Sequence, residues 1–502
     1  MHMSLLTSTL QLDRQAKLPM FRQLYAAIKQ AILSGAMPPG MQLPPSRDFC
    51  RSLSISRQTV LNAYEQLLAE GYLCGAVGKG TYVSLQLPLR ASAPPALELS
   101  APDRTPPLPP PQALSQRGLR YANPAGQSHF HQDKTRAFRV SMPGLDVFPF
   151  QVWARLEARR WRHHEDKLGY GDPAGYPPLR ELLAVYLKAA RGVNCRPEQI
   201  IITSGSQQAL YLLSTMLLDP GDAAWVESPG YRGAVAPLHA AQARLCHVPV
   251  DQDGLDVAYA AAHYPQAKLV YVTPSHQLPL GMTMSLQRRL ALLAWAKAQR
   301  AWVVEDDYDS EYRYSGAPLA SLQSLDQSGC VIYVGTLSKV LFPGLRLGYM
   351  VLPEALVQPL VQAKAIIDKH TAIVPQMVLA DFIAEGHFSR HIKRTRKLYG
   401  ERQAALLHAL DTTLADELRC GASDGGLDLA VHFRQGRDEQ AIVQAGLAAG
   451  LELRALSHYV TASEETKPDQ FAPGLLLGFA SVTEAEIAQG ATVLRKLLRE
   501  KN

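Results

Sequence analysis

Four side chains in the middle of the sequence could together bind and use an aldehyde. Lys339 stands in the segment Gly-Thr-Leu-Ser-Lys and offers an amine that can condense with a carbonyl group. Asp306 and Tyr308 follow an apolar run upstream, and Arg346 lies seven residues after Lys339. A carboxylate can pair with a ring nitrogen and a guanidinium with a phosphate, so this set suits a phosphorylated pyridine aldehyde.

Pyridoxal 5'-phosphate is such an aldehyde, and each part of it finds a candidate partner. Lys339 would form the Schiff base, Asp306 would keep the ring nitrogen protonated, and Tyr308 would face the ring oxygen. Tyr231, in the segment Glu-Ser-Pro-Gly-Tyr, could stack on the ring. A phosphate dianion favours backbone amides at a helix N-terminus together with hydroxyls and an arginine. The residues placed to supply these groups are Gly205, Ser206, Gln207, Thr336, Ser338 and Arg346.

Each of these residues has a more ordinary interpretation when it is taken alone. A lysine after a serine is most often on the surface, a tyrosine is most often packed, and a glycine-serine turn opens many helices that bind no phosphate. The order and spacing of the whole set favour the cofactor site.

The candidate site needs an α/β framework, and the sequence from about residue 137 to 502 has that pattern. Short β-rich runs, such as 199–203, 268–272 and 331–334, alternate with amphipathic helical stretches. At 502 residues the chain is long enough for two or more domains. Residues 86–136 are rich in proline, which predicts a semi-extended linker or a loop laid against one domain.

Residues 15–85 have a different pattern, of helices followed by a glycine-rich hairpin. A first helix ends at Ser34-Gly35, a second opens at 43–47 with Ser46 as its N-cap, and a third follows Ser54-Ile55-Ser56. The apolar positions that predict the buried faces of the first and third helices are Leu24, Ile28, Ala31, Ile32, Val60, Tyr64, Leu67 and Leu68. The glycines of the hairpin are Gly71, Gly75, Gly78 and Gly80. This order predicts a winged helix-turn-helix.

Two observations favour DNA as the partner of this segment. Arg57, Gln58 and Asn62 fall off the buried face of the third helix, where they could contact DNA. Residues 1–85 hold eight lysines and arginines against four acidic residues, and so supply +4 of the net charge of +6. A modestly basic module is compatible with phosphate contact.

The motifs of both segments resemble known families. LPPSRDFCRSLSISRQTVLNAYEQLLAEGYLCGAVGKGTYV is similar to the GntR-type winged helix. From Phe138 onward, the motifs GYGDPAGYPPLRELLAVYL, TSGSQQAL, ESPGY, EDDYDSEYRY and GTLSKVLFPGLRLGYMVLP resemble fold-type I, aspartate-aminotransferase-like enzymes. The combination resembles the MocR/GabR subfamily of bacterial regulators.

The resemblance implies roles for further residues. In the aminotransferase-like domain it implies pyridoxal 5'-phosphate at Lys339, and Tyr170 would reach the phosphate of a neighbouring subunit. It also implies a head-to-tail homodimer that binds two half-sites of double-stranded operator DNA. The residues that would meet the DNA are Arg47, Ser56, Arg57, Thr59, Lys79 and Gly80.

Two departures from the aminotransferase pattern bear on activity. The segment 276–281 reads His-Gln-Leu-Pro-Leu-Gly, with Leu280 in place of the usual threonine, and His276 is either near the cofactor or a packed, satisfied histidine. The C-terminal strand 474–480 lacks the arginine that grips a substrate carboxylate. Arg232 and Arg454 are candidate substitutes.

These observations favour a regulator over an enzyme. The leading hypothesis is a transcriptional regulator that senses pyridoxal phosphate, or an amine or amino acid effector, through the Lys339 aldimine. The alternative is an active aminotransferase with an appended DNA-binding module. For the regulator, at most a residual transaminase half-reaction is expected. Six scattered cysteines predict neither a zinc site nor a disulfide framework. No long apolar run predicts a signal peptide or membrane span, so a cytoplasmic protein is expected.

Overall fold

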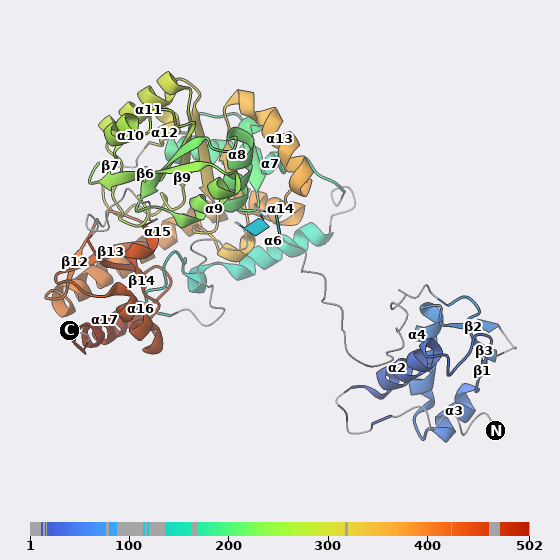
Figure 1. Ribbon diagram of the computed structural model, residues 1–502. Coiled ribbons are helices and arrows are strands. Elements are labelled where there is room, and N and C mark those ends of the chain that lie inside the picture. Colours follow the sequence, from blue (N-terminus) through green and yellow to red (C-terminus); the bar gives the residue numbers. More distant parts are fainter. Residues whose placement is uncertain are drawn as a thin grey trace, which may run out of the picture. The chain divides into compact units, whose positions relative to one another are not determined.

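The computed structural model of the chain describes residues 12–13, 16, 18–76, 80–87, 114–115, 118–119, 136–162, 169–316, 320–422, 424–460 and 472–500. They fall into two compact units, Met1–Pro111 and Gln112–Asn502 (Figure 1). Most of the linker expected at 86–136 lies outside the described residues.

In its described residues, the smaller unit contains three helices and a small sheet, as the sequence predicts. The helices are α2 (Met20–Leu33), α3 (Ser46–Ser52) and α4 (Arg57–Ala69). The antiparallel sheet has the order β1 (Gln42–Leu43), β3 (Gly80–Val83) and β2 (Leu73–Ala76). The apolar positions predicted for α2 are all buried, and Gly35 ends the helix with a φ of +83°. The helix-turn-helix and its hairpin wing are therefore present.

Two details of this unit differ from the prediction. Ser46 is the first residue of α3 and not its N-cap, which is Pro45. Leu43 pairs with Thr81 in the sheet, so only Pro44 and Pro45 separate β1 from the helix. Leu68 is 38% exposed instead of buried. The core stripe of α4 runs through Val60, Ala63, Tyr64 and Leu67, and Leu68 lies about 100° around the helix from Leu67.

The larger unit is built on an eight-stranded sheet. Its order is β4 (Ile200–Thr203), β11 (Gly348–Val351), β10 (Val331–Thr336), β9 (Trp302–Asp307), β8 (Leu269–Val272), β5 (Ala223–Ser228), β6 (Arg244–Asp251) and β7 (Gly254–Leu255). Strands β10, β9, β8, β5 and β6 are parallel, whereas β11 runs antiparallel to both of its neighbours. The predicted α/β framework is confirmed.

Helices cover both faces of this sheet because successive strand residues point to opposite sides. Val304 packs in the cluster with α8 (Ser206–Leu217), α9 (Arg232–Ala240) and α13 (Glu354–Asp368). Val303 packs in the opposite cluster with α10 (Val257–His263), α11 (Leu286–Gln299) and α12 (Leu322–Leu325). Helices α7 (Pro177–Arg191), α14 (Ile373–Ala384) and α6 (Phe150–Arg162) enclose a further core.

The C-terminal part of the larger unit contains a second, smaller sheet with its own helices. After the long helix α15 (His387–Thr413) comes an antiparallel sheet of order β12 (Leu418–Cys420), β13 (Asp428–Phe433), β15 (Gly474–Gly478) and β14 (Arg454–Ala455). Helices α16 (Glu439–Ala448) and α17 (Glu484–Glu500) pack with it (Figure 1). Phe138 bridges to Gly478, so the start of the unit is tied to this sheet. Among the described residues, no helix is long and apolar enough to cross a membrane.

Candidate cofactor site and nucleic-acid interface

The predicted cofactor residues come together at the carboxyl ends of the parallel strands. Asp306 lies at the end of β9 with Tyr308 directly after it, and Thr336 ends β10 just ahead of Lys339. The turn at Ser204 follows β4 and leads into α8. In open α/β sheets, ligands bind at this edge.

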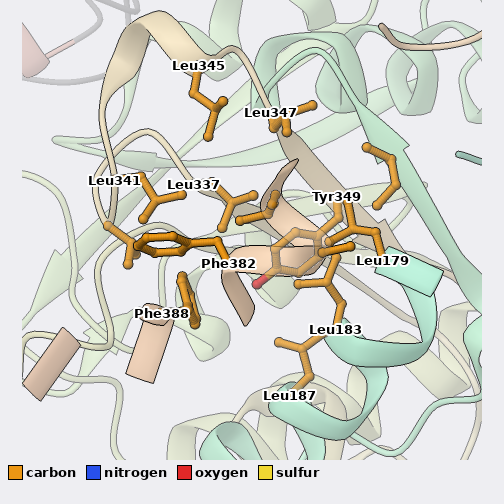
Figure 2. Close-up of a cluster of buried hydrophobic side chains, with 14 of the residues drawn as sticks. Leu179, Leu183, Leu187, Leu337, Leu341, Leu345, Leu347, Tyr349, Phe382 and Phe388 are labelled. Carbon is orange, nitrogen blue, oxygen red and sulfur yellow. The ribbon is translucent and has the colours of Figure 1, made fainter. Parts of the chain in front are cut away.

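The loop that carries Lys339 is held in place by leucines on either side of it. Leu337 and Leu341 are buried in the core that contains α7 and α14, and Leu345 and Leu347 anchor the return of the loop. Figure 2 shows Leu337 and Leu341 beside Phe382, with Leu345 and Leu347 farther along the same cluster. Lys339 lies between anchored positions, so its direction is set by its neighbours.

Lys339 is half-buried and hydrogen-bonded. Its Nζ donates to the carbonyl oxygen of Ser141, at 2.7 Å. Burial lowers the pKa of Lys339, against the raising effect of the carboxylates of Asp428, Asp309 and Asp306. A lowered pKa makes the neutral, nucleophilic amine more available.

Asp306 has one oxygen paired and the other unpaired. Oδ2 accepts a 2.6 Å hydrogen bond from the hydroxyl of Tyr271, while Oδ1 is buried and has no hydrogen-bond partner among the described residues. Burial raises the pKa of Asp306 to about 7, although the Tyr271 bond opposes the shift. A buried acceptor without a partner is unfavourable, and an N–H donor from a protonated pyridine ring would satisfy it. The site therefore fits pyridoxal phosphate.

Tyr308 and His276 form a hydrogen-bonded pair. The Tyr308 hydroxyl lies 3.0 Å from His276 Nδ1 and 3.0 Å from the His276 carbonyl oxygen. His276 Nδ1 also lies 3.0 Å from Asp309 Oδ2. Burial opposes the charged imidazole, but Asp309 raises the pKa of His276 overall. His276 is thus hydrogen-bonded and packed, and it also contacts Tyr308, which is predicted to bind the cofactor. The two interpretations from the sequence, a packed histidine and a histidine near the cofactor, are therefore compatible.

The proposed phosphate cradle lies around Gly205, which precedes α8. Gly205 has a φ of +102°, and a side chain there would meet the Arg346 guanidinium at 3.1 Å. Arg346 Nη2 donates to the carbonyl of Ser204 at 2.8 Å. Ser206 opens the helix, so amides of its first turn point to the same region. Across the loop, the Ser338 amide donates to Thr336 Oγ1 at 3.3 Å.

Gln207 and Tyr231 approach the site from the two helices beside the cradle. The Gln207 side-chain amide donates to the carbonyl of Gly233, and its Oε1 is buried without a partner in the described part of the chain. Tyr231 lies just ahead of α9, with its ring centroid 6.5 Å from that of Tyr271. Burial raises the pKa of Tyr231 to about 12, so its phenol stays neutral.

Tyr170 makes no comparable approach within its own chain. The side chain is 93% exposed and lies edge-on to the His370 ring, with centroids 6.3 Å apart. That Tyr170 reaches the cofactor phosphate of a neighbouring subunit stays a prediction.

Three residues of the site were missed by the sequence analysis. Tyr271 holds Asp306, and Asp428 accepts from the amide and hydroxyl of Ser141 at 2.7 and 3.2 Å. Ser141, with a φ of +60°, in turn accepts from Lys339. A phenol and a carboxylate inside apolar strands need polar partners, which is a signal for Tyr271 and Asp428. The sequence holds no such signal for Ser141.

The C-terminal strand presents one leucine to the site. In β15, Leu475, Leu476 and Leu477 are all buried, but Leu475 and Leu477 pack in the core on the opposite face. Leu476 belongs to an apolar cluster with Leu278 and Tyr459, against which Tyr231 and Tyr308 pack. This apolar surface can pack against apolar groups but cannot bind a carboxylate.

The predicted DNA-contacting residues lie at the start of α4 and beside it. Ser56 caps α4 by accepting from the amide of Thr59 at 3.1 Å. Arg57 and Gln58 are exposed, and Gln58 Nε2 donates to Asn62 Oδ1 at 2.7 Å. Arg47 is exposed on α3, and Gly80 opens β3 with a φ of +99°. Lys79 lies outside the described residues.

A winged helix-turn-helix and an aspartate-aminotransferase fold in one chain define a class of transcriptional regulators with an aminotransferase-like domain. Residues 21–83 match the family described as bacterial regulatory proteins, gntR family, and residues 142–494 match aminotransferase class I and II. The chain is 39% identical over 487 residues to a probable rhizopine catabolism regulatory protein, MocR, of Rhizobium meliloti, which covers 96% of this chain and 94% of that protein. The chain belongs to the MocR subfamily of GntR regulators.

Another relative and two solved structures also cover large parts of the chain. The chain is 32% identical over 437 residues to the pyridoxine biosynthesis transcriptional regulator PdxR of Corynebacterium glutamicum, covering 87% of this chain and 88% of that protein. Among solved structures, the kynurenine aminotransferase of Pyrococcus horikoshii matches 74% of this chain and 92% of its own, with a TM-score of 0.67 and 30% identity. An aspartate aminotransferase of Thermus thermophilus, at 21% identity and a TM-score of 0.65, covers 77% of this chain and 99% of its own and shares the fold.

Proposed function

We propose that the protein is a pyridoxal-phosphate-dependent regulator that detects an amine at Lys339 and changes its affinity for operator DNA. The observation that carries the proposal is the buried, unpartnered oxygen of Asp306 beside a half-buried lysine of lowered pKa. The cofactor, when bound, supplies an aldehyde carbon that can exchange between Lys339 and another amine.

The residues of the chain would hold the cofactor by separate means. Asp306 would accept from the ring nitrogen, Tyr308 would donate to the ring oxygen, and Tyr231 would cover the ring face. Tyr170 of a second subunit in a head-to-tail homodimer would complete the phosphate site. The phosphate would be bound by the helix amides and polar side chains of Gly205, Ser206, Gln207, Thr336, Ser338 and Arg346.

DNA would be bound by the winged helix. The start of α4 would enter the major groove, because Arg57 and Gln58 are exposed there while the opposite side of α4 is buried. Lys79 and Gly80 would place the wing near the phosphates. A change at the cofactor site alters DNA affinity only if the effector binds one arrangement of the protein better than another.

The effector is an amine, an amino acid or pyridoxal phosphate itself. Support for the cofactor as effector is that the Corynebacterium relative is named for pyridoxine biosynthesis. Support for an amine is the reactive lysine. Titrating operator DNA with the protein, alone and with pyridoxal phosphate or a panel of amines, separates the two.

An active aminotransferase is the second candidate, because the set of cofactor residues matches that of an enzyme and the fold matches solved aminotransferases. The apolar surface around Leu476 counts against it, because it cannot bind a substrate carboxylate. Steady-state transamination over a panel of amino donors decides: sustained turnover favours the enzyme, and none favours the regulator.

A further inference from the structure

A hydrogen-bonded chain leads from Tyr308 to a buried carboxylate. His276 Nδ1 lies 3.0 Å from the Tyr308 hydroxyl oxygen, and it lies 3.2 and 3.0 Å from the two oxygens of Asp309. Asp309 is 2% exposed and directly follows Tyr308 in the sequence. The positions of the hydrogens in this chain decide which group Tyr308 can donate to.

The carboxylate of Asp309 fixes the hydrogen of the imidazole. A carboxylate can only accept, so His276 carries a hydrogen on Nδ1, both when the ring is neutral and when it is charged. The phenol oxygen of Tyr308 faces this N–H and accepts from it as well. The hydroxyl hydrogen of Tyr308 then points away from the imidazole, and the carbonyl oxygen of His276, at 3.0 Å, receives it. Tyr308 is thus kept as a donor toward every group other than the imidazole.

The imidazole ring is held so that it cannot turn away from Tyr308. Its far edge lies against the backbones of Gly426 and Gly281, where an added Cβ would meet His276 Cε1 at 2.1 Å and Nε2 at 3.4 Å, respectively. Tyr314 fixes Gly426 by donating to its carbonyl oxygen at 2.7 Å. Packing therefore sets the direction of Nδ1 and leaves its hydrogen to be set by the carboxylate.

The charged groups around the ring favour the same arrangement. Burial lowers the pKa of His276, but Asp309, with help from Asp428, raises it above its usual value, and Arg313 opposes them. When the ring gains a proton, the new hydrogen is placed on Nε2 and the hydrogen on Nδ1 stays. The direction of the Tyr308 hydroxyl therefore persists while His276 titrates.

We infer that Asp309 and His276 are positioning residues of the cofactor site, and that they direct the hydroxyl hydrogen of Tyr308 to the ring oxygen of the bound cofactor. On binding, the hydroxyl exchanges the carbonyl oxygen of His276 for the ring oxygen, while the imidazole N–H stays on the phenol. The inference rests on the proposed function, which puts the cofactor ring at Tyr308.

The test measures the pH at which the visible absorbance of the lysine-bound cofactor changes. A donor to the ring oxygen stabilises negative charge there, so the nitrogen that Lys339 contributes loses its proton at a lower pH. Removal of the donor by Tyr308→Phe is therefore expected to raise the midpoint of the absorbance change by about one pH unit.

Asp309→Asn separates a positioning role from an effect of charge. Burial lowers the pKa of the Lys339 amine, while the carboxylates of Asp428 and Asp309 raise it, so loss of either charge by itself lowers the midpoint. An asparagine can donate to the imidazole, so Nδ1 can lose its hydrogen and accept that of Tyr308. We expect Asp309→Asn to raise the midpoint, as Tyr308→Phe does. Asp428→Asn, whose carboxylate accepts from Ser141 in the wild type, is the matched control and should lower it.

Further variants trace the path of the effect. In a Tyr308→Phe background, Asp309→Asn no longer raises the midpoint, because the phenol through which it acts is gone. His276→Leu keeps the carboxylate of Asp309 and raises the midpoint. His276→Gln keeps the wild-type midpoint, because its amide nitrogen carries two hydrogens, one for each neighbour. The melting temperature of each cofactor-free variant verifies that it is folded.

The possible results separate this inference from the proposed function. If Asp309→Asn and His276→Leu both lower the midpoint or leave it unchanged, Asp309 acts by charge alone and the inference is wrong, while the proposed function stands. If Asp309→Asn raises the midpoint equally in the Tyr308→Phe background, its effect does not pass through Tyr308, and the inference is again wrong. A wild type that shows no visible absorbance of a lysine-bound cofactor contradicts the proposed function itself, and the inference with it.

Discussion

The hydroxyl of Tyr271 donates a 2.6 Å hydrogen bond to one oxygen of Asp306, and no other residue that the structure describes pairs with the second oxygen of this buried carboxylate. A phenol in the neighbouring strand β8 thus fixes the carboxylate and directs its unsatisfied oxygen to accept from something else. Because an unpaired buried acceptor costs about 1–3 kcal/mol, the arrangement is most stable with a donor bound.

Asp306→Asn is expected to weaken pyridoxal phosphate binding by about tenfold or more, because the neutral amide cannot pair with a protonated ring nitrogen. Tyr271→Phe keeps the carboxylate of Asp306 and should reduce the affinity for pyridoxal phosphate by less than Asp306→Asn does. The measurement is the dissociation constant from the visible absorbance of the bound cofactor. Equal affinity for wild type and Asp306→Asn would show that the ring nitrogen does not lie at this carboxylate.

The stability of the cofactor-free protein should depend on pH through Asp306. Its pKa is raised from 3.8 to about 7 on folding, so between these values the folded state retains a proton that the unfolded chain has lost. The contribution of this carboxyl to the free energy of unfolding therefore falls as pH rises from about 4 to 7. Urea unfolding at several pH values should show that Asp306→Asn, relative to wild type, becomes more stable over this range. If the free energies of unfolding of wild type and Asp306→Asn change equally with pH, the pKa of Asp306 is not raised in the folded protein.

Gly205→Ala should impair phosphate binding. A residue other than glycine is strained at a φ of +102°, and the new Cβ would meet the Arg346 guanidinium at 3.1 Å. The strain costs about 1–3 kcal/mol, and displacement of Arg346 should add a loss of cofactor affinity. Gly192→Ala is the matched control, since Gly192 has a φ of +68° and its nearest contact is Ser324 at 3.6 Å, away from the cradle. If both variants bind pyridoxal phosphate like wild type, Gly205 is not part of the phosphate site.

Arg57→Ala should weaken operator binding and leave the cofactor absorbance unchanged. Loss of one phosphate or base contact is expected to cost about 1–3 kcal/mol, and loss of a phosphate contact would reduce the salt slope by about one. Arg22→Ala, an exposed arginine on α2, is the control for the lost charge alone. Fluorescence anisotropy with labelled operator over a series of salt concentrations measures the affinity and the salt slope of both variants. An effect of equal size in the two variants would place the recognition surface elsewhere.

The parts of the site that could be predicted from the sequence are those whose chemistry restricts residue type and position. Lys339, Asp306 and Tyr308 follow apolar strands in an order that few other functions require, and the parallel strands then bring them to one edge. Ser141 could not be predicted, because it acts through a backbone carbonyl and belongs to a segment about 200 residues from Lys339.

The errors in the small unit have a local cause. Ser46 was predicted as the N-cap of α3 but is the first residue of the helix, and Leu68 was predicted as buried but lies beside the buried face of α4. Helix ends and the edges of helix faces are ambiguous in a sequence by about one residue. Pairing of Leu43 with Thr81 across the sheet decided where α3 begins, and that contact is not visible in the local pattern.

The central claim is that Lys339 couples a small amine or aldehyde to DNA binding. The most direct test is the operator affinity of wild type and Lys339→Ala, each measured with and without pyridoxal phosphate and the effector amine. The account predicts that the variant stays folded, loses the visible absorbance of the lysine-bound cofactor, and binds operator with one affinity whatever ligand is added, whereas the wild type responds. A Lys339→Ala protein whose operator affinity still responds to these ligands as the wild type does would contradict it.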